Sequence, residues 1–437
     1  MSKLLDSLRS GFWFVPMVMI AAALFLASVL VAVDRTMQVE GITILGELFP
    51  KGTQSASTLL SAIATSLLTV TGSVFSIAIV AIQLASGQFG PRMLRDFMQD
   101  RSNQITFGVC SATFVYTIAV LWAVEDSKNI SFTPQISVFV SLLLTIVSVC
   151  VLVFFVHNIA NAVHADNLIA RIGRDLEGCI DRLFPEREEE TNRLVWEVSS
   201  DFESKATAML ATHSGYIQQI DTERLKAIAS QHNLVLKVLY RPGQFVVQNS
   251  VLFYAQSKTD LKLLNRNVLG KQLDQSISRG NQRKPKHDVE FPIKQLVEIA
   301  IRAISPAVND PFTAVRCIDR LSVSLCYVLQ KAPQKTYLFD SADALRVIVE
   351  PTTFEILTNA AFDQIRQYGQ TDVAVTIRLL EAMSVIARQT HTETQRGVLR
   401  RQVEMVNRSG QNSDNIPEEN DRQDILYHYQ AAIRELR

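Results

Sequence analysis

Four long stretches without Asp, Glu, Lys or Arg constrain this chain more than any other feature. They run over residues 10–33, 52–91, 105–124 and 129–165. The interior of a bilayer holds no water to solvate an ion, so long apolar stretches without charge mark membrane spans. After Asp166 the chain has the charge density of an ordinary soluble protein. The sequence therefore predicts an α-helical membrane domain with four transmembrane helices, over residues 1–165, followed by a soluble domain.

Each stretch is long enough for one membrane-crossing helix. The predicted spans are Phe12–Val33, a segment within Leu59–Ala85, Ile105–Val124 and Pro134–Val156. At about 1.5 Å per residue, roughly 20 residues cross the hydrocarbon core. Lys3 precedes the first stretch, as in a cleaved signal peptide. The apolar run exceeds the usual signal length of about 7–15 residues, which favours an uncleaved span.

Loop charges predict the orientation in the membrane. Four spans place both chain ends on one side. The N-terminal tail, the second loop and the segment after the fourth span carry Lys and Arg, whereas the other two loops mix them with Asp and Glu. Cytoplasmic loops carry the excess of Lys and Arg. We therefore expect a multi-pass membrane protein with cytoplasmic N- and C-termini.

The second span differs from the others in its hydroxyl side chains at four-residue intervals. They are Ser57, Ser61, Thr65, Thr69 and Ser73. Residues four apart share a helix face, so the five hydroxyls form a slowly turning stripe. Small hydroxyl residues allow close helix packing in lipid, and around an oligomer axis their oxygens can replace part of the water shell of an ion. The stripe is predicted either to pack against other helices or to line a pore.

A sequence that breaks helices follows this span. Gly87, Gly90 and Pro91 are predicted to stop or bend the second helix. Arg92 and Arg95 come next, at the expected cytoplasmic end. If the stripe lines a pore, the two arginines form a basic mouth that favours anions. Otherwise they anchor the helix on the cytoplasmic side.

Polar residues follow the fourth span directly. His157, Asn161 and His164 would share one face if the helix continued. Two imidazoles can hold a metal or respond to pH. Asn is a poor zinc ligand, however, and polar residues are expected where a helix leaves lipid, so we expect no metal site. Apolar spacing beyond Asp166 predicts an amphipathic helical stalk or linker over residues 166–210.

Residues 211–285 are predicted to form a small α+β subdomain. A β-α-β-β unit is indicated by strand-like stretches at 215–220, 234–240, 245–247 and 251–254 and a helix at 222–231. Such a unit cannot bury a large core alone, so we expect it to pack on helices or on another subunit. Residues 193–210 are expected to be helical, and residues 275–290 to form a polar linker.

Residues 286–408 are predicted to form a helical subdomain. Apolar spacing indicates helices at 291–304 and 312–331. The turn between them contains Pro306, Asn309, Asp310 and Pro311, with Asp310 as the N-cap and Pro311 at the first helical position. Charged residues on the two arms are expected to form ion pairs across this hairpin; they are Glu298, Arg302, Arg316, Asp319 and Arg320.

Weaker patterns complete the chain. Two further helices are expected around 340–349 and 371–390. Residues 409–437 are expected to form a polar tail with a short terminal helix, and the composition of 411–421 predicts disorder. The fold class is thus an α-helical membrane domain plus an α+β domain that is mostly helical.

Composition excludes several function classes. The formal net charge is zero, so no basic face for nucleic acid is indicated. The five cysteines form no Cys-x-x-Cys pair, which leaves no sign of a thiolate zinc site. Motifs for serine hydrolases, zinc proteases and P-loop enzymes are missing from the sequence. We expect a protein that is not an enzyme and that needs no cofactor or metal.

Two segments carry a family resemblance. They are Gln83–Arg92, which reads QLASGQFGPR, and Ile304–Ala314, which reads ISPAVNDPFTA. The chain resembles, from the first span to about residue 400, a bacterial family of predicted integral membrane proteins, domain-of-unknown-function family 2254. Ala307 and Val308 stand where the family pattern has Gly-Ile. The resemblance implies the bacterial inner membrane and four spans, and it assigns no activity or catalytic residue.

These observations favour a homo-oligomeric membrane protein that forms an ion channel or conduit. The second span would line the pore, and the cytoplasmic domain would assemble or gate it. A membrane-anchored sensor or scaffold is the alternative, in which the cytoplasmic domain binds a partner, an anion or a small molecule and nothing is transported. In either case we expect the lipid bilayer and further copies of the chain as partners.

Overall fold

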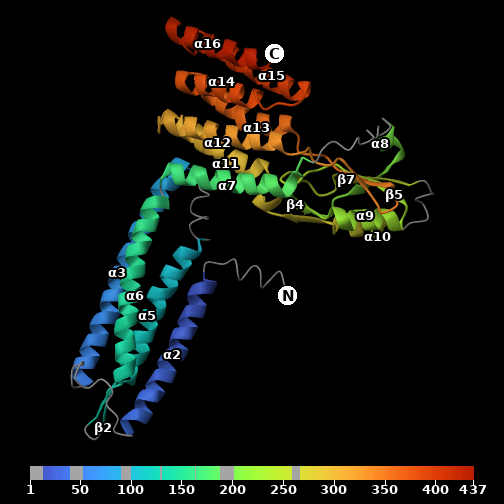
Figure 1. Ribbon diagram of the computed structural model, residues 1–437. Coiled ribbons are helices and arrows are strands. Elements are labelled where there is room, and N and C mark those ends of the chain that lie inside the picture. Colours follow the sequence, from blue (N-terminus) through green and yellow to red (C-terminus); the bar gives the residue numbers. More distant parts are fainter. Residues whose placement is uncertain are drawn as a thin grey trace. The chain divides into compact units, whose positions relative to one another are not determined.

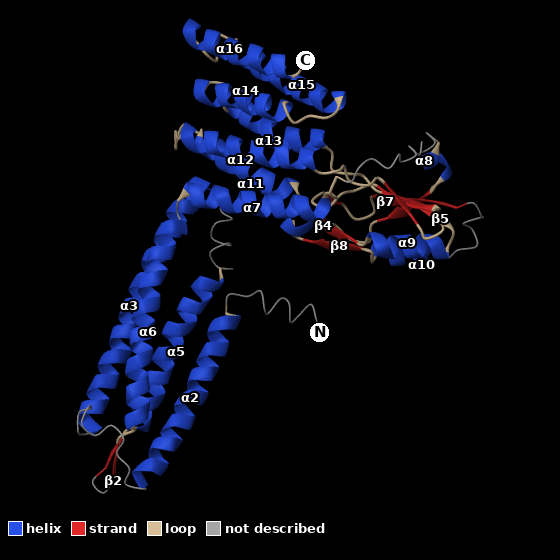
Figure 2. Ribbon diagram, viewed as in Figure 1, coloured by secondary structure: helices blue, strands red, loops and turns tan. Residues whose placement is uncertain are grey.

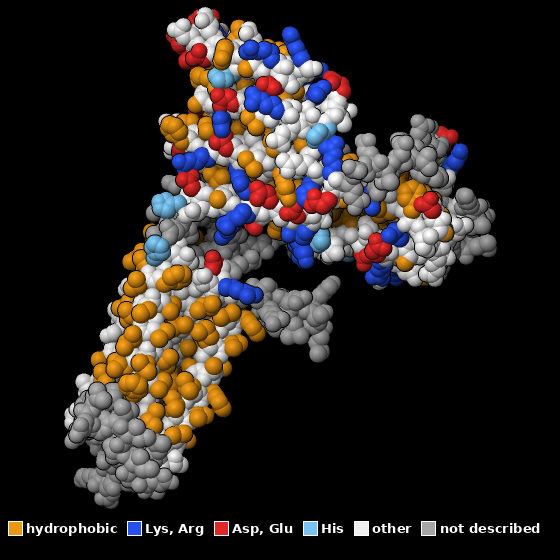
Figure 3. Space-filling view, viewed as in Figure 1, with side chains coloured by type: hydrophobic (Ala, Val, Ile, Leu, Met, Phe, Trp, Pro, Cys, Tyr) orange, Lys and Arg blue, Asp and Glu red, His pale blue; other side chains and the backbone are white. Residues whose placement is uncertain are grey.

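The chain forms two compact units, Met1–Asn167 and Leu168–Arg437, here the membrane unit and the C-terminal unit. A computed structural model describes residues 13–39, 53–89, 100–127, 130–162, 164–187, 201–257 and 266–437 (Figure 1). Apolar side chains cover the helices of the membrane unit, whereas charged side chains of both signs cover the C-terminal unit (Figure 3). The surface chemistry therefore changes where the charge-free stretches end.

Four helices of the membrane unit are long and apolar enough to cross a bilayer, as the charge pattern predicts. They are α2 (Phe14–Val39), α3 (Thr53–Phe89), α5 (Arg101–Ala123) and α6 (Gln135–Ala162), with a short antiparallel pair, β1 (Glu125–Ser127) and β2 (Ile130–Phe132), before α6. Trp13 and Trp122 are 72% and 93% exposed near opposite ends of the bundle. Exposed Trp side chains are typical of the two membrane–water interfaces.

Helices α5 and α6 each contact the three other helices of the membrane unit, and the contact between α2 and α5 is the most extensive. Small residues allow the close approach of α2 and α5. A Cβ atom added to Gly108 of α5 would lie 2.3 Å from the sulfur of Met19 on α2. The core also contains Ala23, Leu60 and Tyr116. Close packing of this kind drives helix association in lipid, where the hydrophobic effect is missing.

Buried hydroxyl groups join α5 to α6. Three hydrogen bonds connect them: Tyr116 Oη to the Ser137 carbonyl oxygen (3.1 Å), Thr117 Oγ1 with Ser141 Oγ (2.9 Å), and Ser148 Oγ to Thr113 Oγ1 (2.9 Å). Several of these hydroxyls also bond a carbonyl oxygen one turn earlier on their own helix. Each interhelical bond of this type contributes roughly 0.6 kcal/mol in a membrane protein. The hydroxyl pattern recognised in the sequence lies on the second span, so these bonds between α5 and α6 were not predicted.

A buried carboxylate ties the end of α2 to the start of α6. Asp34 is 7% exposed, and its oxygens accept hydrogen bonds from the amides of Ile136 (3.0 Å) and Ser137 (2.9 Å) and from the Ser137 hydroxyl (2.6 Å). The first amides of a helix have no partner within the helix, and the partial positive charge there favours an anion. Asp34 therefore caps α6 from another helix.

The C-terminal unit contains two small sheets. The first has strand order β3-β7-β5-β10-β9 and the second β6-β4-β8. Their bounds are β3 (Thr207–Leu210), β4 (Gly215–Ile220), β5 (Leu234–Val238), β6 (Phe245–Val246), β7 (Val251–Ser257), β8 (Ile277–Gly280), β9 (Tyr337–Phe339) and β10 (Leu345–Ile348). Helices α9 (Thr222–Gln231) and α10 (Arg266–Asp274) accompany them. Leu225, Leu236 and Phe253 belong to their common core.

The predicted β-α-β-β order is confirmed, but its strands are divided between both sheets. Three local predictions are wrong. Residues 207–210, predicted helical, form β3, next to the short helix α8 (Phe202–Lys205). The predicted linker at 275–290 contains β8 and a 3-10 turn, η2 (Pro285–His287). The helix predicted at 340–349 is β10, which pairs with β5 in parallel. In each case pairing with a distant strand decides the conformation.

The rest of the C-terminal unit is a stack of helices (Figure 2). They are α7 (Ala165–Leu183), α11 (Glu290–Ala303), α12 (Pro311–Gln330), α13 (Phe354–Tyr368), α14 (Val373–Ala387), α15 (Glu393–Gly410) and α16 (Glu419–Glu435). Contacts between α11, α13 and α15 form one layer, and contacts between α12, α14 and α16 form the other. Three consecutive helix pairs thus stack as in helical repeat proteins.

The predicted helices at 291–304, 312–331 and 371–390 are confirmed as α11, α12 and α14. Helix α13 was not predicted. The disorder predicted at 411–421 is wrong, because Ile416 is 1% exposed and the amide of Ile416 bonds the Asn412 carbonyl at 2.9 Å. The terminal helix α16 is long and packs on α14 and α15. The buried Ile416 and hydrogen bonds such as that from Arg422 to the Ile416 carbonyl oxygen (2.6 Å) hold this polar segment in place.

We predict that Asp34→Ala destabilises the membrane unit. The substitution leaves buried amides at the start of α6 without an acceptor, which costs about 1–3 kcal/mol. The measurement is the thermal unfolding of the full chain in detergent, and Tm should fall. Ser28→Ala is the matched control, because this exposed hydroxyl bonds only the Leu24 carbonyl on its own helix. An equal Tm for both variants would show that the Asp34 cap does not stabilise the bundle.

Candidate functional site

The hydroxyl stripe of α3 faces away from the helix bundle. Leu60, Ala64 and Leu67 are buried on the bundle side of α3. Ser57 is half-buried, and Ser61, Thr65, Thr69 and Ser73 are all exposed. Four residues rotate a helix by about 400°, so successive members advance by about 40° around the axis. The stripe therefore starts beside the bundle contacts and crosses to the opposite face.

Two hydroxyl groups of α3, Thr69 in the stripe and Ser76 beyond it, donate their hydrogens within the helix itself. Thr69 Oγ1 donates to the Thr65 carbonyl oxygen at 2.8 Å, and Ser76 Oγ donates to the Gly72 carbonyl at 2.9 Å. Each hydroxyl oxygen retains acceptor capacity. The hydroxyl oxygens on the outer face of α3 can thus accept hydrogen bonds from groups outside the bundle. Such a surface can pack against an identical helix or contact a hydrated cation.

The structure corrects one prediction at the end of this helix. Helix α3 continues through Gly87 to Phe89, so Gly87 does not end or break it. Gly90, Pro91, Arg92 and Arg95 lie outside the described residues. The metal-binding face considered after the fourth span required a continuous helix. Helix α6 ends at Ala162, and His164 lies in neither α6 nor α7, so it does not continue the face of His157.

The turn between α11 and α12 has the predicted cap. Asp310 Oδ1 accepts a hydrogen bond from the Thr313 amide (3.2 Å), and Oδ2 accepts one from the Thr313 hydroxyl (2.6 Å). Pro311 is the first helical residue, and Pro306 lies exposed in the turn. Asn309 has φ of 51°. Asn tolerates this left-handed conformation, so the turn needs no glycine at Ala307.

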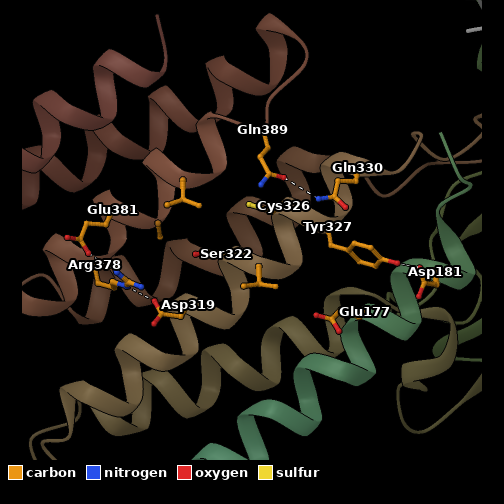
Figure 4. A pocket seen from close by; sticks show the side chains of 13 residues that line it. Glu177, Asp181, Asp319, Ser322, Cys326, Tyr327, Gln330, Arg378, Glu381 and Gln389 are labelled. Atoms are coloured by element: carbon orange, nitrogen blue, oxygen red, sulfur yellow. Dashed lines mark hydrogen bonds and ion pairs between the residues drawn. The ribbon is translucent and has the colours of Figure 1, made fainter. Parts of the chain in front are cut away.

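A cavity of about 630 Å³ opens between α7, α12 and α14 (Figure 4). Its lining combines carboxylates and amides with apolar side chains and one thiol. The residues are Glu177, Asp181, Asp319, Ser322, Val323, Cys326, Tyr327, Gln330, Arg378, Glu381, Ala382, Val385 and Gln389. Four carboxylates and one guanidinium thus surround an apolar floor. A cavity of this size and mixed lining is typical of small-molecule sites.

One side of the cavity is organised by Arg378. Its guanidinium donates to Asp319 of α12 and, at 2.8 Å, to Glu381 on its own helix. His428 Nδ1 of α16 lies 3.6 Å from the second oxygen of Glu381. The predicted ion pairs across the α11–α12 hairpin are wrong for Asp319, which pairs with α14, and for Arg320, which bonds Glu177 of α7 at 2.8 Å.

The opposite side is organised by Asp181 of α7. Lys331 Nζ lies 2.9 Å from its carboxylate, and the Tyr327 hydroxyl donates to the same oxygen. Hydrogen bonds from Lys331 and Tyr327 lower the pKa of Asp181, so the carboxylate stays charged over a wider range of pH. Burial raises the pKa of the Cys326 thiol, which therefore lines the cavity as an unreactive neutral group.

Sequence reasoning did not predict this cavity. Its lining comes from three helices, of which α7 precedes α12 by more than 100 residues along the chain, and each carboxylate alone resembles an ordinary surface charge. A partial signal was present in the apolar residues Val323 and Val385, which interrupt the charged faces of two amphipathic helices. A second hollow of about 590 Å³ lies between α11 and α13, lined mainly by charged and amide groups such as Glu298, Arg302 and Asp363.

We predict a pH-dependent effect of Lys331→Met. A carboxylate with a lowered pKa stabilises the folded state above its unfolded pKa of about 3.9, and this contribution is lost as pH falls through the folded value. Removal of the ammonium group should therefore lower Tm clearly near about pH 7, and the difference from wild type should shrink near about pH 3. Lys294→Met is the control, because the ammonium group of Lys294, which pairs with Glu290, is more exposed than that of Lys331. A difference in Tm that does not change with pH would contradict the role assigned to Asp181.

Comparison with known proteins gives relatives without an assigned activity. Residues 9–384 match the model of the family described as predicted membrane protein DUF2254. Two uncharacterized proteins, Mb1321c of Mycobacterium bovis and Rv1290c of Mycobacterium tuberculosis, are each 27% identical over 97% of this chain and 80% of their own length. No solved structure matches.

The family match covers both units, from before α2 to within α14, and it agrees with the four apolar helices of the structure. The resemblance drawn from the two sequence segments is thereby confirmed. The chain belongs to the DUF2254 family of predicted membrane proteins.

Proposed function

We propose that this protein is a homo-oligomeric conduit of the bacterial inner membrane, with α3 facing the symmetry axis. The observation that carries the proposal is the exposed hydroxyl face of α3, which runs from Ser61 to Ser73 on the side away from the bundle. Oxygen acceptors repeated around an axis can replace part of the water shell of a permeating ion. The proposed role is transport and not catalysis.

The energetics of lipid exposure support an assembly through α3. The bundle buries several hydroxyl groups between α5 and α6, among them Thr113, Thr117 and Ser148. On α3 the equivalent groups remain outside, next to exposed apolar residues such as Leu68 and Ile77. Small hydroxyl residues on an outer face allow close contact between identical helices. Subunit contact would place the stripe in a protein-lined or hydrated environment.

The C-terminal unit is proposed to lie in the cytoplasm and to assemble or gate the conduit. The loop charges support this orientation. Stacked helix pairs support the assembly role, since such stacks present extended surfaces to partners. Free cysteines in the C-terminal unit, among them Cys179 and Cys317, also fit a reducing compartment.

A cross-linking experiment tests the position of α3. The chain with Cys150→Ala retains only buried natural cysteines among the described residues. Thr65→Cys or Thr69→Cys in this background should give covalent oligomers with a short bismaleimide in membranes. Ile146→Cys is the control, because this residue is 53% exposed and lies on α6, not on α3. Equal yields at Thr69 and Ile146, or monomers throughout, would contradict the proposal.

Conductance tests the transport step separately. Purified protein in planar bilayers should pass current under some combination of voltage, pH and membrane tension. Thr69→Leu should reduce the unitary conductance, because it replaces an oxygen acceptor with a larger apolar side chain. Leu68→Thr is the control, because it makes the reverse exchange of side chains at a position next to the stripe. Specific α3 cross-links without any current would leave an oligomeric assembly and exclude the conduit.

The cavity between α7, α12 and α14 supports a second function, a ligand-binding sensor. Its lining has four carboxylates and the guanidinium of Arg378, and Arg320 and Lys331 pair with two of these carboxylates from outside the lining, so the carboxylates still outnumber the cations and favour an organic cation. Val323 and Val385 provide apolar contact for a short alkyl chain. We propose that a small organic amine binds here and reports its presence through the helix stack.

A thermal-shift measurement with spermidine as the probe tests this second function. A ligand that binds only the folded state raises Tm as its concentration rises. Spermidine should raise the Tm of the wild type, and Val385→Trp should remove the shift by filling the opening of the cavity. Val247→Trp, a change at another exposed valine, should leave the shift intact. If both variants shift like the wild type, the amine binds elsewhere.

A further inference from the structure

The turn between α11 and α12 presents apolar side chains to the outside of the C-terminal unit. Phe312 is 77% exposed and Val308 is 37% exposed. Pro306 and Ala307 of the same turn are also exposed. Aromatic side chains of this size are normally buried, because they have a large apolar surface to remove from water. The turn therefore needs a partner that offers an apolar environment.

The backbone of this turn is held in one conformation. The Asp310 amide bonds the Ala303 carbonyl oxygen at 2.7 Å, and the amides of Val308 and Asn309 both bond the Ser305 carbonyl, at 3.0 and 2.9 Å. The Asp310 side chain then caps α12. Ordered turns of this kind lose little conformational entropy on binding. The apolar tip is thus built to stay exposed and does not fold back onto the unit.

The turn lies at the end of the C-terminal unit where α7 begins. Arg320 bonds Glu177, and a Cβ atom on Gly173 would overlap the Arg320 guanidinium. One to two turns further along both helices, Tyr327 bonds Asp181. Because later residues of α7 contact later residues of α12, the two helices run side by side in the same direction. Figure 1 shows the start of α7 and the α11–α12 turn at the same end of the stack.

Chain connectivity limits how far this end can lie from the bilayer. The apolar segment of α6 ends at Ile159, and α7 begins at Ala165. Six residues reach at most about 20 Å, and a helical link reaches half of that. Phe312 precedes Arg320 by eight residues, about 12 Å, which puts Phe312 level with the first turn of α7. Packed helices lie about 8–10 Å apart, so Phe312 is within reach of the headgroup region.

We propose that the α11–α12 turn is a lipid-docking surface, which inserts Phe312 and Val308 into the headgroup–acyl boundary of the membrane that α6 spans. Arg316 is exposed one turn after Phe312 on the same side of α12, where it can meet lipid phosphates. The short link to α6 keeps the turn near the bilayer in every copy, and this high effective concentration allows a small apolar tip to bind.

Spin labels on the full chain in lipid nanodiscs test the proposal. The lipid is a mixture of phosphatidylcholine and phosphatidylglycerol, and Cys150→Ala removes the exposed natural thiol among the described residues. Phe312→Cys carries the label in one sample and Tyr427→Cys in the other. Tyr427 is a matched control, because it is an aromatic residue with 63% exposure on α16, in the last helix pair of the stack.

The two relaxation agents are oxygen, which concentrates in lipid, and a neutral nickel chelate, which stays in water. A label at 312 should collide more with oxygen and several-fold less with nickel than a label at 427. Nickel accessibility equal to that at 427 would overturn the proposal, because the turn would then be in water. Protection from both agents together with dipolar broadening would also overturn it, since a second copy of the chain would then cover the turn.

Discussion

The cost of placing a charge or an unpaired polar group in hydrocarbon governs the membrane unit. Backbone groups are satisfied by forming helices, and side chains must be apolar or find partners inside the bundle. The structure meets this demand with hydroxyls, which can bond a carbonyl on their own helix and a second helix at once. Asp34 is the buried carboxylate of this unit among the described residues, and it lies where helix amides at the start of α6 need an acceptor. Polar chemistry in this bundle is therefore placed where backbone geometry leaves a group unpaired.

A different constraint shapes the C-terminal unit, where small sheets and short helices bury little surface alone. Strands β9 and β10 come between α12 and α13 in the sequence, yet they complete the sheet that begins with β3. The stack and the larger sheet are consequently linked twice through the chain. Leu236 of β5 and Val347 of β10 are buried in adjacent strands of this sheet. Subdomains predicted as separate segments of sequence are in fact interleaved.

Local rules predicted the features that depend on neighbours in the chain. The four spans follow from missing charges, and the start of α12 follows from Asp310 and Pro311, because a cap bonds an amide three residues away. Features that need a distant partner were not predictable. The bond between Thr117 and Ser141 requires α5 beside α6, and β10 required β5 to prevent a helix. The carboxylates of the cavity could not be predicted for the same reason, since Asp319 and Arg378 meet only after the helices stack.

The hydroxyl stripe shows why a local pattern alone does not decide a function. Five hydroxyls at four-residue spacing were identified from the sequence, but the spacing says nothing about which way the stripe faces. In the structure the same residue types occur in two environments: bonded between α5 and α6, and exposed on α3 with hydrogens given to their own backbone. The first set stabilises the bundle. In the second set, the Thr69 hydroxyl bonds the Thr65 carbonyl oxygen of its own helix and joins no other helix of the same copy. We propose that this polar face makes its contacts outside the subunit, with another copy or with water and ions along an axis.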